Sequence, residues 1–241
     1  MLSPYGMDLV ENCLTCKLRA DRIFCSLPAP TLQAFENIKF TSAYPTGAVL
    51  FVEGEQPRGI FVLCKGRVKL SVGASNGKTL IVKIAEPGEL LGASAAVSGK
   101  PYEMTGETID PCQISFVKRE DFLVFLRQNG DACFKLAEQL SEKYHNACKE
   151  VRWLGLSHSA AEKLARLLLE WSSRKRDGLR SEIRIKLGLT HEEIAQMIGT
   201  SRETVSRLFA DLKKRQILHF DGATLVICNP AALRSFTNNH N

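Results

Sequence analysis

The spacing of apolar residues divides the chain into three differently patterned regions. Between residues 47 and 117 the apolar residues form short runs separated by glycine-rich turns. In the run Val68-Lys69-Leu70-Ser71-Val72 apolar and polar residues alternate, which is typical of a strand with one buried face. Short strands at short intervals predict a compact antiparallel barrel or jelly roll. The expected strands cover residues 49–52, 60–64, 68–72, 80–84 and 114–117.

From Asp131 onward the apolar residues recur every three or four positions, which predicts one helix of roughly 25 residues. A narrow stripe on so long a helix favours pairing with a second copy of the same helix. Packing on the chain's own sheet domain is the alternative. The predicted dimerisation residues are Leu136, Leu140, Tyr144, Ala147, Val151 and Leu154.

Residues 190–215 have the pattern of two short helices around a tight turn. Ala195 is small enough for close helix packing, and Gly199 suits a left-handed turn. Val205 and Leu208 follow six and nine residues beyond that glycine and are expected to face the core. This is the spacing of a helix-turn-helix, whose second helix enters the DNA major groove.

The residues on either side extend this motif. Thr190 is the expected N-cap of the first helix, and Glu193 completes a capping box three residues later. After the second helix, two apolar runs at 217–220 and 224–227 surround an Asp-Gly pair, which predicts a hairpin. The sequence therefore predicts a winged helix-turn-helix.

The second helix carries side chains that can read bases. Arginine can donate two hydrogen bonds to guanine, and glutamate can accept one from the cytosine amino group. The turn spacing favours this interpretation over a merely solvated helix face. For the basic end, 213–215, phosphate contacts and a favourable helix dipole remain equal alternatives. The predicted DNA-binding residues are Arg202, Glu203, Ser206, Arg207, Thr190, Thr200, Ser201 and Lys213.

Charge supports a nucleic-acid partner. The 241 residues carry a net charge of +6, and residues 157–241 hold 14 Lys and Arg against 9 Asp and Glu. The positive excess therefore accompanies the helix-turn-helix, as a polyanionic partner requires. No apolar run approaches the roughly 20 residues that span a bilayer, and no signal peptide is evident. We expect a cytoplasmic protein without membrane contact, in which the eight cysteines form no disulfide framework.

The expected fold class is α+β, with four consecutive parts. A cysteine-bearing segment at 1–28 precedes a β-roll at 29–128, which is an antiparallel jelly roll. A dimerisation helix at 129–156 then leads to a winged helix-turn-helix domain at 157–241. Within that last domain we expect a helix from Ser159 to Ser173 and a polar loop from Arg174 to Arg180.

Several motifs in this order resemble the CRP/FNR family of bacterial transcription regulators. They are Phe-x-Glu-Gly-Glu at 51–55, Gly-Arg-Val-Lys-Leu at 66–70, Gly-Glu-Leu-Leu-Gly at 88–92 and Ser-Arg-Glu-Thr-Val-Ser-Arg at 201–207. The resemblance implies a β-roll like that of cyclic-nucleotide-binding domains. It also implies a homodimer that binds an inverted repeat with TTGA-containing half-sites and contacts RNA polymerase.

The cysteines suggest the signal. Cys13 and Cys16 are close enough in sequence for one metal centre, and Cys25 follows nine residues later. Cys112, in Thr108-x-x-x-Cys112, resembles the fourth ligand of the oxygen-sensing FNR branch, which implies a four-iron four-sulfur cluster on Cys13, Cys16, Cys25 and Cys112. The eight residues between Cys16 and Cys25 exceed the usual FNR gap, so that loop must fold differently.

Other interpretations of these residues stay open. Cys112 could be a plain core thiol, and Cys13-x-x-Cys16 could be a zinc half-site or a redox dithiol. The remaining four, Cys64, Cys133, Cys148 and Cys228, are expected to be packing residues.

Two other effectors and a catalytic role are not expected. Residues 100–104, Lys-Pro-Tyr-Glu-Met, lack the arginine that holds the cyclic phosphate in the cyclic-AMP branch, so we expect no cyclic nucleotide. No histidine lies in the β-roll, so we expect no haem and no enzyme activity.

Overall fold

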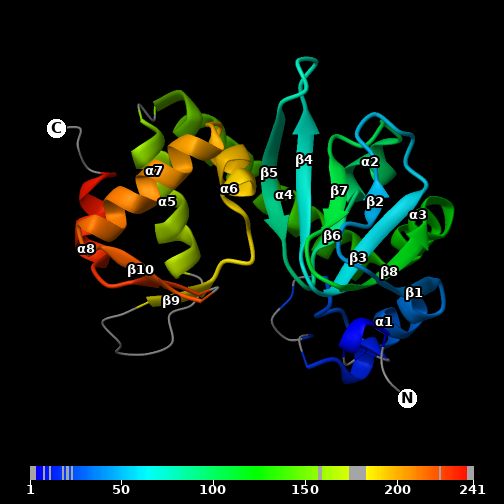
Figure 1. Ribbon diagram of the computed structural model, residues 1–241. Coiled ribbons are helices and arrows are strands. Elements are labelled where there is room, and N and C mark those ends of the chain that lie inside the picture. Colours follow the sequence, from blue (N-terminus) through cyan, green and yellow to red (C-terminus); the bar gives the residue numbers. More distant parts are fainter. Residues whose placement is uncertain are drawn as a thin grey trace. The chain divides into compact units, whose positions relative to one another are not determined.

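The computed structural model describes residues 4–7, 9–10, 12–17, 19, 22, 24–156, 159–173, 183–222 and 224–237. The chain divides into two compact units, Met1–Glu150 and Val151–Asn241, which are drawn in Figure 1. The fold class is the predicted one: a double-sheet β-roll, a long helix and a helix-turn-helix with a small sheet.

The N-terminal unit contains two antiparallel four-stranded sheets, with strand orders β1-β8-β3-β6 and β2-β7-β4-β5. All five predicted strands are confirmed, and their ends differ from the prediction by two residues at most. Three further strands were not predicted. One of them, β1, is a largely exposed edge strand, and another, β6, is only two residues long, so neither has a clear apolar pattern. The strands are β1 (Lys39–Tyr44), β2 (Val49–Phe51), β3 (Gly59–Lys65), β4 (Val68–Gly73), β5 (Thr79–Ala85), β6 (Leu90–Leu91), β7 (Thr105–Thr108) and β8 (Cys112–Lys118).

Helices flank these sheets. The predicted long helix is confirmed as α4, with 27 residues. The helix α3, directly before it, was not predicted. The helices of this region are α1 (Ala29–Glu36), α2 (Ala93–Ser98), α3 (Arg119–Gln128) and α4 (Gly130–Leu156), and two short 3-10 turns, η1 (Pro4–Gly6) and η2 (Cys13–Thr15), precede them.

The sheet β1-β8-β3-β6 is buried on both faces. Phe61, Leu63 and Ile114 point into the inter-sheet core, where they meet residues of the second sheet. Alternate residues point the other way, into what we call the outer core. The outer core comprises Phe24, Leu27, Leu32, Phe35, Ile60, Val62, Leu90, Ala93, Ala96, Val117, Phe122, Phe125, Leu126, Ala132 and Leu136.

The N-terminal segment is part of this outer core. Phe24 and Leu27 are fully buried, and Cys13 and Leu14 pack against the cluster from its edge. The Gln113 side chain, on β8, accepts a hydrogen bond from the Val10 backbone N–H (2.7 Å) and donates one to the Val10 carbonyl (2.6 Å). The segment that carries three cysteines is therefore docked on the outer face of the sheet.

The C-terminal unit packs a helical layer on a three-stranded antiparallel sheet of order β10-β11-β9. The predicted hairpin is confirmed as β10 and β11. The third strand, β9, was not predicted, although Ile183 and Ile185 alternate with polar residues. The predicted loop Arg174–Arg180 lies outside the described residues. The elements are α5 (Ala160–Ser173), β9 (Ile183–Lys186), α6 (His191–Ile198), α7 (Arg202–Lys214), β10 (Leu218–Asp221), β11 (Thr224–Ile227) and α8 (Pro230–Ser235).

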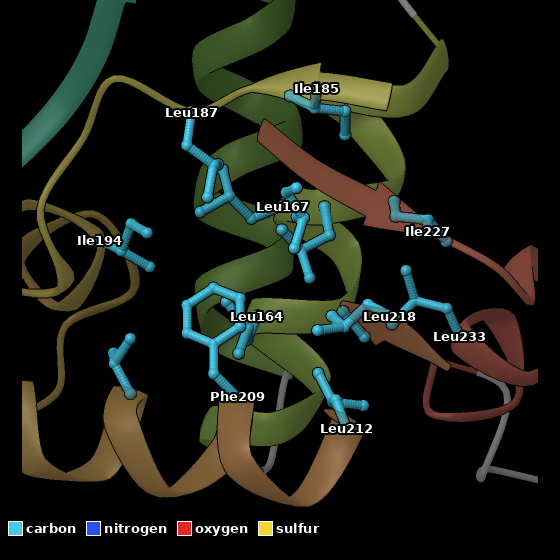
Figure 2. Packing of buried hydrophobic residues seen from close by; sticks show 14 of the residues in the cluster. Leu164, Leu167, Ile185, Leu187, Ile194, Phe209, Leu212, Leu218, Ile227 and Leu233 are labelled. Atoms are coloured by element: carbon cyan, nitrogen blue, oxygen red, sulfur yellow. The ribbon is translucent and has the colours of Figure 1, made fainter. Parts of the chain in front are cut away.

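One apolar core joins these elements, as Figure 2 shows. Leu164 from α5, Phe209 from α7 and Ile227 from β11 are all buried in it. The motif helices are therefore held by both a third helix and the sheet. Within the described part of the chain, no helix is long and apolar enough to cross a bilayer.

Candidate nucleic-acid interface and cysteine site

The first motif helix, α6, begins at the predicted capping box. The Thr190 hydroxyl accepts a hydrogen bond from the Glu193 backbone N–H (3.2 Å), and the Glu193 carboxylate accepts one from the Thr190 backbone N–H (2.8 Å). Two backbone donors that a helix start leaves unpaired are thereby satisfied. The sequence prediction for this helix end is confirmed.

The turn between the two helices depends on Gly199. Its φ of +64° lies in the left-handed region, and an added Cβ would meet no atom within 4 Å. The requirement for glycine is thus conformational rather than steric. Ala195 is buried, and its carbonyl accepts the Thr200 backbone N–H at 3.0 Å. The predicted close packing at Ala195 is confirmed.

The second motif helix, α7, starts at Ser201, whose hydroxyl caps the Thr204 backbone N–H at 3.2 Å. Val205 is fully buried, as predicted. Leu208 is only half-buried at the edge of the core, and the fully buried neighbour is Phe209. The reason is that the helix's buried stripe runs through positions 205, 209 and 212, spaced four and three residues apart.

The opposite side of α7 presents the predicted reading residues. Arg202, Glu203 and Arg207 are exposed, and the Arg207 guanidinium donates to the Thr204 hydroxyl at 3.3 Å. Hydrogen bonds from the backbone at the helix start and from Ser201 lower the pKa of Glu203, so its carboxylate stays charged and accepts only. These side chains are exposed on the side of α7 that faces away from its buried stripe.

Ser206 differs from Arg202, Glu203 and Arg207, because it is half-buried. Its hydroxyl oxygen lies 2.9 Å from Nδ1 of His191, and the His191 ring stacks on Phe209 at 5.1 Å between ring centroids. This contact ties the start of α6 to the middle of α7. The role of His191 was missed because its partner is fifteen residues away in sequence.

The cations at the basic end of α7 are all exposed, and they differ in their contacts. Arg215 pairs with Asp211 at 2.9 Å and lies 5.6 Å from the Phe236 ring centroid. Lys213 and Lys214 are exposed. The exposed ammonium groups suit phosphate contacts better than Arg215 does.

The predicted dimerisation stripe on α4 is only partly exposed. Leu136 is 4% exposed and belongs to the outer core, and Leu140 packs against the same core. The prediction was therefore wrong for Leu136, because the chain's own outer core covers it. Tyr144, Ala147 and Val151 are exposed, and the side chain of Leu154 lies outside the described residues.

A different stripe on α4 is exposed along its length. Phe134 (65% exposed), Tyr144 (68%) and Val151 (71%) are unusually accessible for large apolar residues. They belong to a set with alternating spacings of three and four residues, as in a coiled-coil seam. This exposed stripe consists of Phe134, Ala137, Ser141, Tyr144, Cys148 and Val151.

Lys39 lies beside Cys13 of the N-terminal segment. The Lys39 ammonium donates to the Cys13 sulfur at 3.1 Å and to the Glu36 carboxylate at 2.8 Å. Burial, followed by the hydrogen bond to Glu36, raises the pKa of the Cys13 thiol to about 12. Burial likewise raises the pKa of Cys25 to about 11, followed by the charges of Cys64 and Cys16. A metal bound here must therefore displace protons from buried thiols.

Cys112 does not join this group. It is fully buried in the inter-sheet core, and its thiol donates to the Arg67 carbonyl (3.3 Å) and the Asp110 carbonyl (3.2 Å). The next residue, Gln113, holds the N-terminal segment on the opposite face of the sheet. Among the described residues, no three His, Cys, Asp or Glu side chains are already arranged to hold a metal ion.

The loop at 86–89 and its surroundings are occupied by internal contacts. Glu89 pairs with Lys83 at 2.5 Å and accepts the Glu86 backbone N–H at 3.0 Å. Glu103 accepts from the Ser94 hydroxyl at 2.7 Å, and Tyr102 is buried against Phe51. The stretch 100–104 thus contributes the Glu103 carboxylate, the buried Tyr102 ring and the exposed Lys100 side chain, and it contains no arginine.

The two units match two family models. Residues 41–129 match the cyclic nucleotide-binding domain, and residues 162–236 match the Crp-like helix-turn-helix domain. Joined in this order, they define a DNA-binding transcription regulator. The chain belongs to the CRP/FNR family. Regulators of this family bind DNA and act as dimers.

Individual relatives agree with this assignment. The cAMP-activated global transcriptional regulator CRP of Pasteurella multocida (strain Pm70) is 26% identical over 199 residues, which cover 82% of this chain and 94% of that protein. FixK2 from Bradyrhizobium japonicum has a TM-score of 0.73 at 22% identity, covering 85% of this chain and 100% of that chain. A CooA mutant from Carboxydothermus hydrogenoformans has a TM-score of 0.75 at 21% identity, covering 96% and 98%. The relatives are transcription regulators and not enzymes.

Proposed function

We propose that this regulator is controlled by a redox or oxygen signal received at its N-terminal cysteines through an iron–sulfur cluster. One observation carries the proposal: the cysteine-bearing segment and the first half of α4 share the outer core. Cys13 and Leu14 pack against the cluster that contains Leu136, with Leu140 at its edge. A change at the cysteines therefore acts on the packing of the helix that bears the exposed stripe.

The donor set suits such a cofactor. Cys13, Cys16 and Cys25 lie in one docked segment, and thiolates are the ligands that iron–sulfur clusters require. A bound cluster would supply chemistry that responds reversibly to oxygen. The chain's own part is to hold the Cys13 thiol beside Lys39, whose ammonium offsets the negative charge of a thiolate.

The signal would change DNA binding by changing the fraction of chains that form dimers. When the N-terminal segment is seated, Phe24 and Leu27 fill the outer core against α1 and α3. Displacing this segment would loosen α4 at Leu136 and change the fraction of chains that pair through the exposed stripe. Only a dimer spans two half-sites one helical turn apart on DNA. We propose a TTGA-containing inverted repeat as the operator and RNA polymerase as a further partner.

The first test is the metal content of protein purified without oxygen. We expect iron and acid-labile sulfide in comparable amounts, with visible absorbance that disappears in air. A colourless protein with stoichiometric zinc would instead support a zinc site. If the protein contains neither metal, calorimetry with cyclic nucleotides tests the effector of the cAMP-activated relatives.

The exposed stripe predicts the geometry of the dimer. Two parallel helices related by a two-fold axis bring each stripe residue next to its own copy. Mild oxidation with a copper–phenanthroline catalyst should therefore join two chains through Cys148, giving a covalent dimer on a non-reducing gel. Cys148→Ser should abolish this band. An undiminished band in that variant would show that another surface, such as the one around the exposed Cys133, forms the contact.

A further inference from the structure

The sheet β1-β8-β3-β6 separates two sets of cysteine positions. On β8, Cys112 and Ile114 point into the inter-sheet core, whereas Gln113 and Ser115 point to the outer face. Gln113 binds Val10 of the N-terminal segment on that outer face. A thiol on the same side as Cys13 must therefore come from an outward-facing position, and Cys112 does not occupy one.

Cys64 occupies such a position. Its sulfur lies 3.5 Å from the Ser115 hydroxyl oxygen, which itself lies 2.8 Å from the Thr41 hydroxyl oxygen. Leu63, its neighbour, points into the inter-sheet core, so the alternation along β3 also directs Cys64 outward. The pairing of β3 with β8 shifts register between Leu63 and Lys65. Cys64 lies at this irregularity and has no residue directly opposite it on β8.

Contacts on the outer face connect Cys64 to the N-terminal segment. Thr41, whose hydroxyl oxygen lies 2.8 Å from that of Ser115 beside Cys64, is two residues along β1 from Lys39. Residues two apart on a strand point to the same face, and the Lys39 ammonium donates to the Cys13 sulfur at 3.1 Å. The Cys16 backbone N–H in turn donates to the Cys13 carbonyl at 3.4 Å. Cys64 therefore shares the outer face of the sheet with the segment that carries the other thiols.

We infer that Cys64 is the fourth member of a four-thiol site with Cys13, Cys16 and Cys25, and that Cys112 is a core residue. The site joins the docked segment to β3 on the outer face of the sheet. Four thiolates suit an iron–sulfur cluster or a tetrahedral zinc ion. The cluster form of this inference rests on the proposed function.

The first experiment compares Cys64→Ser with Cys112→Ser, two equal changes on paired strands. Each variant and the unaltered protein are reconstituted without oxygen with iron and sulfide, and both elements are then measured per chain. We expect Cys112→Ser to retain the iron and sulfide of the unaltered protein and Cys64→Ser to lose most of both. Cys64→Ala should behave like Cys64→Ser, and circular dichroism should confirm that every variant is folded.

The outcomes separate the two proposals. If Cys112→Ser loses the cluster and Cys64→Ser keeps it, the assignment of Cys64 is overturned while the proposed function stands. If the unaltered protein binds neither iron nor sulfide, the proposed function fails. A measurement without metal then decides whether Cys64 belongs to the site.

That measurement is oxidation of the metal-free full chain with diamide. Two thiols lose two protons and two electrons to form a disulfide, and diamide takes them up to become its hydrazine. We expect mass spectrometry to find Cys64 joined to Cys25 or Cys16, while Cys112 remains available for alkylation after unfolding. A disulfide between Cys112 and an N-terminal cysteine, with Cys64 left as a free thiol, would overturn the inference.

Discussion

Replacing Arg207 by alanine is expected to lower affinity for a palindromic TTGA-containing duplex by about 1–3 kcal/mol relative to random duplex, or roughly 5- to 150-fold. The guanidinium is exposed on α7 and donates a hydrogen bond to the Thr204 hydroxyl. It can therefore make two hydrogen bonds to one guanine, and truncation leaves the partner base without them. Binding of labelled duplexes at fixed salt measures the ratio.

Lys213→Ala is the matched control for this change. Lys213 is exposed at the other end of α7, where we propose a phosphate contact. We expect it to weaken specific and random duplex alike and to reduce the salt dependence of binding by about one unit of slope. If Arg207→Ala also leaves the specific-to-random ratio unchanged, α7 does not read bases through this residue.

Phe209→Ala is expected to lower the free energy of unfolding of the C-terminal unit by about 3–5 kcal/mol. The Phe209 ring is 3% exposed, stacks on His191 and meets Phe220 edge to face at 5.4 Å between ring centroids. Its removal leaves a cavity where both motif helices and β10 meet. Thermal unfolding of the full chain should show the transition of this unit lowered by more than roughly 10 °C.

Leu208→Ala provides the comparison on the adjacent residue. Leu208 is half-buried at the edge of the same core, so we expect a loss of about 1–2 kcal/mol. Equal losses of unfolding free energy for the two variants would mean that α7 is rotated about its own axis, so that Leu208 and Phe209 are equally buried. A larger loss for Leu208→Ala would support the sequence-based expectation that Leu208 faces the core.

The helix-turn-helix was predictable because its determinants are local. A capping box, a left-handed glycine and a small residue at the helix contact act over a few positions, and each is present in the structure. The five strands with clear alternation were likewise predictable from their own residues. Strands β1 and β9 were missed because the first is an exposed edge strand and the second is only four residues long.

The predicted dimerisation residues on α4 show that local pattern does not determine which side of a helix is exposed. The periodicity of α4 indicates a helix with apolar positions, and this was confirmed. Which of those positions are exposed depends on other segments that cover the helix. Leu136 is buried because it belongs to the outer core, to which the N-terminal segment, α1 and α3 contribute, whereas Phe134 is left exposed.

The order of the main parts and the ends of the motif helices follow from the sequence by itself, because helix caps, turn conformations and strand alternation depend on neighbours in the chain. The identity of the thiols that meet is decided only by tertiary structure. Cys64 and Cys112 lie on adjacent strands, and the sequence favours Cys112 as a ligand, through its resemblance to the FNR branch, and Cys64 as a packing residue. Pairing of β3 with β8 places Cys64 on the outer face, where Val10 and Cys13 are docked, and Cys112 in the inter-sheet core. Side chains from distant segments can share a site only where the sheet presents them on the same face.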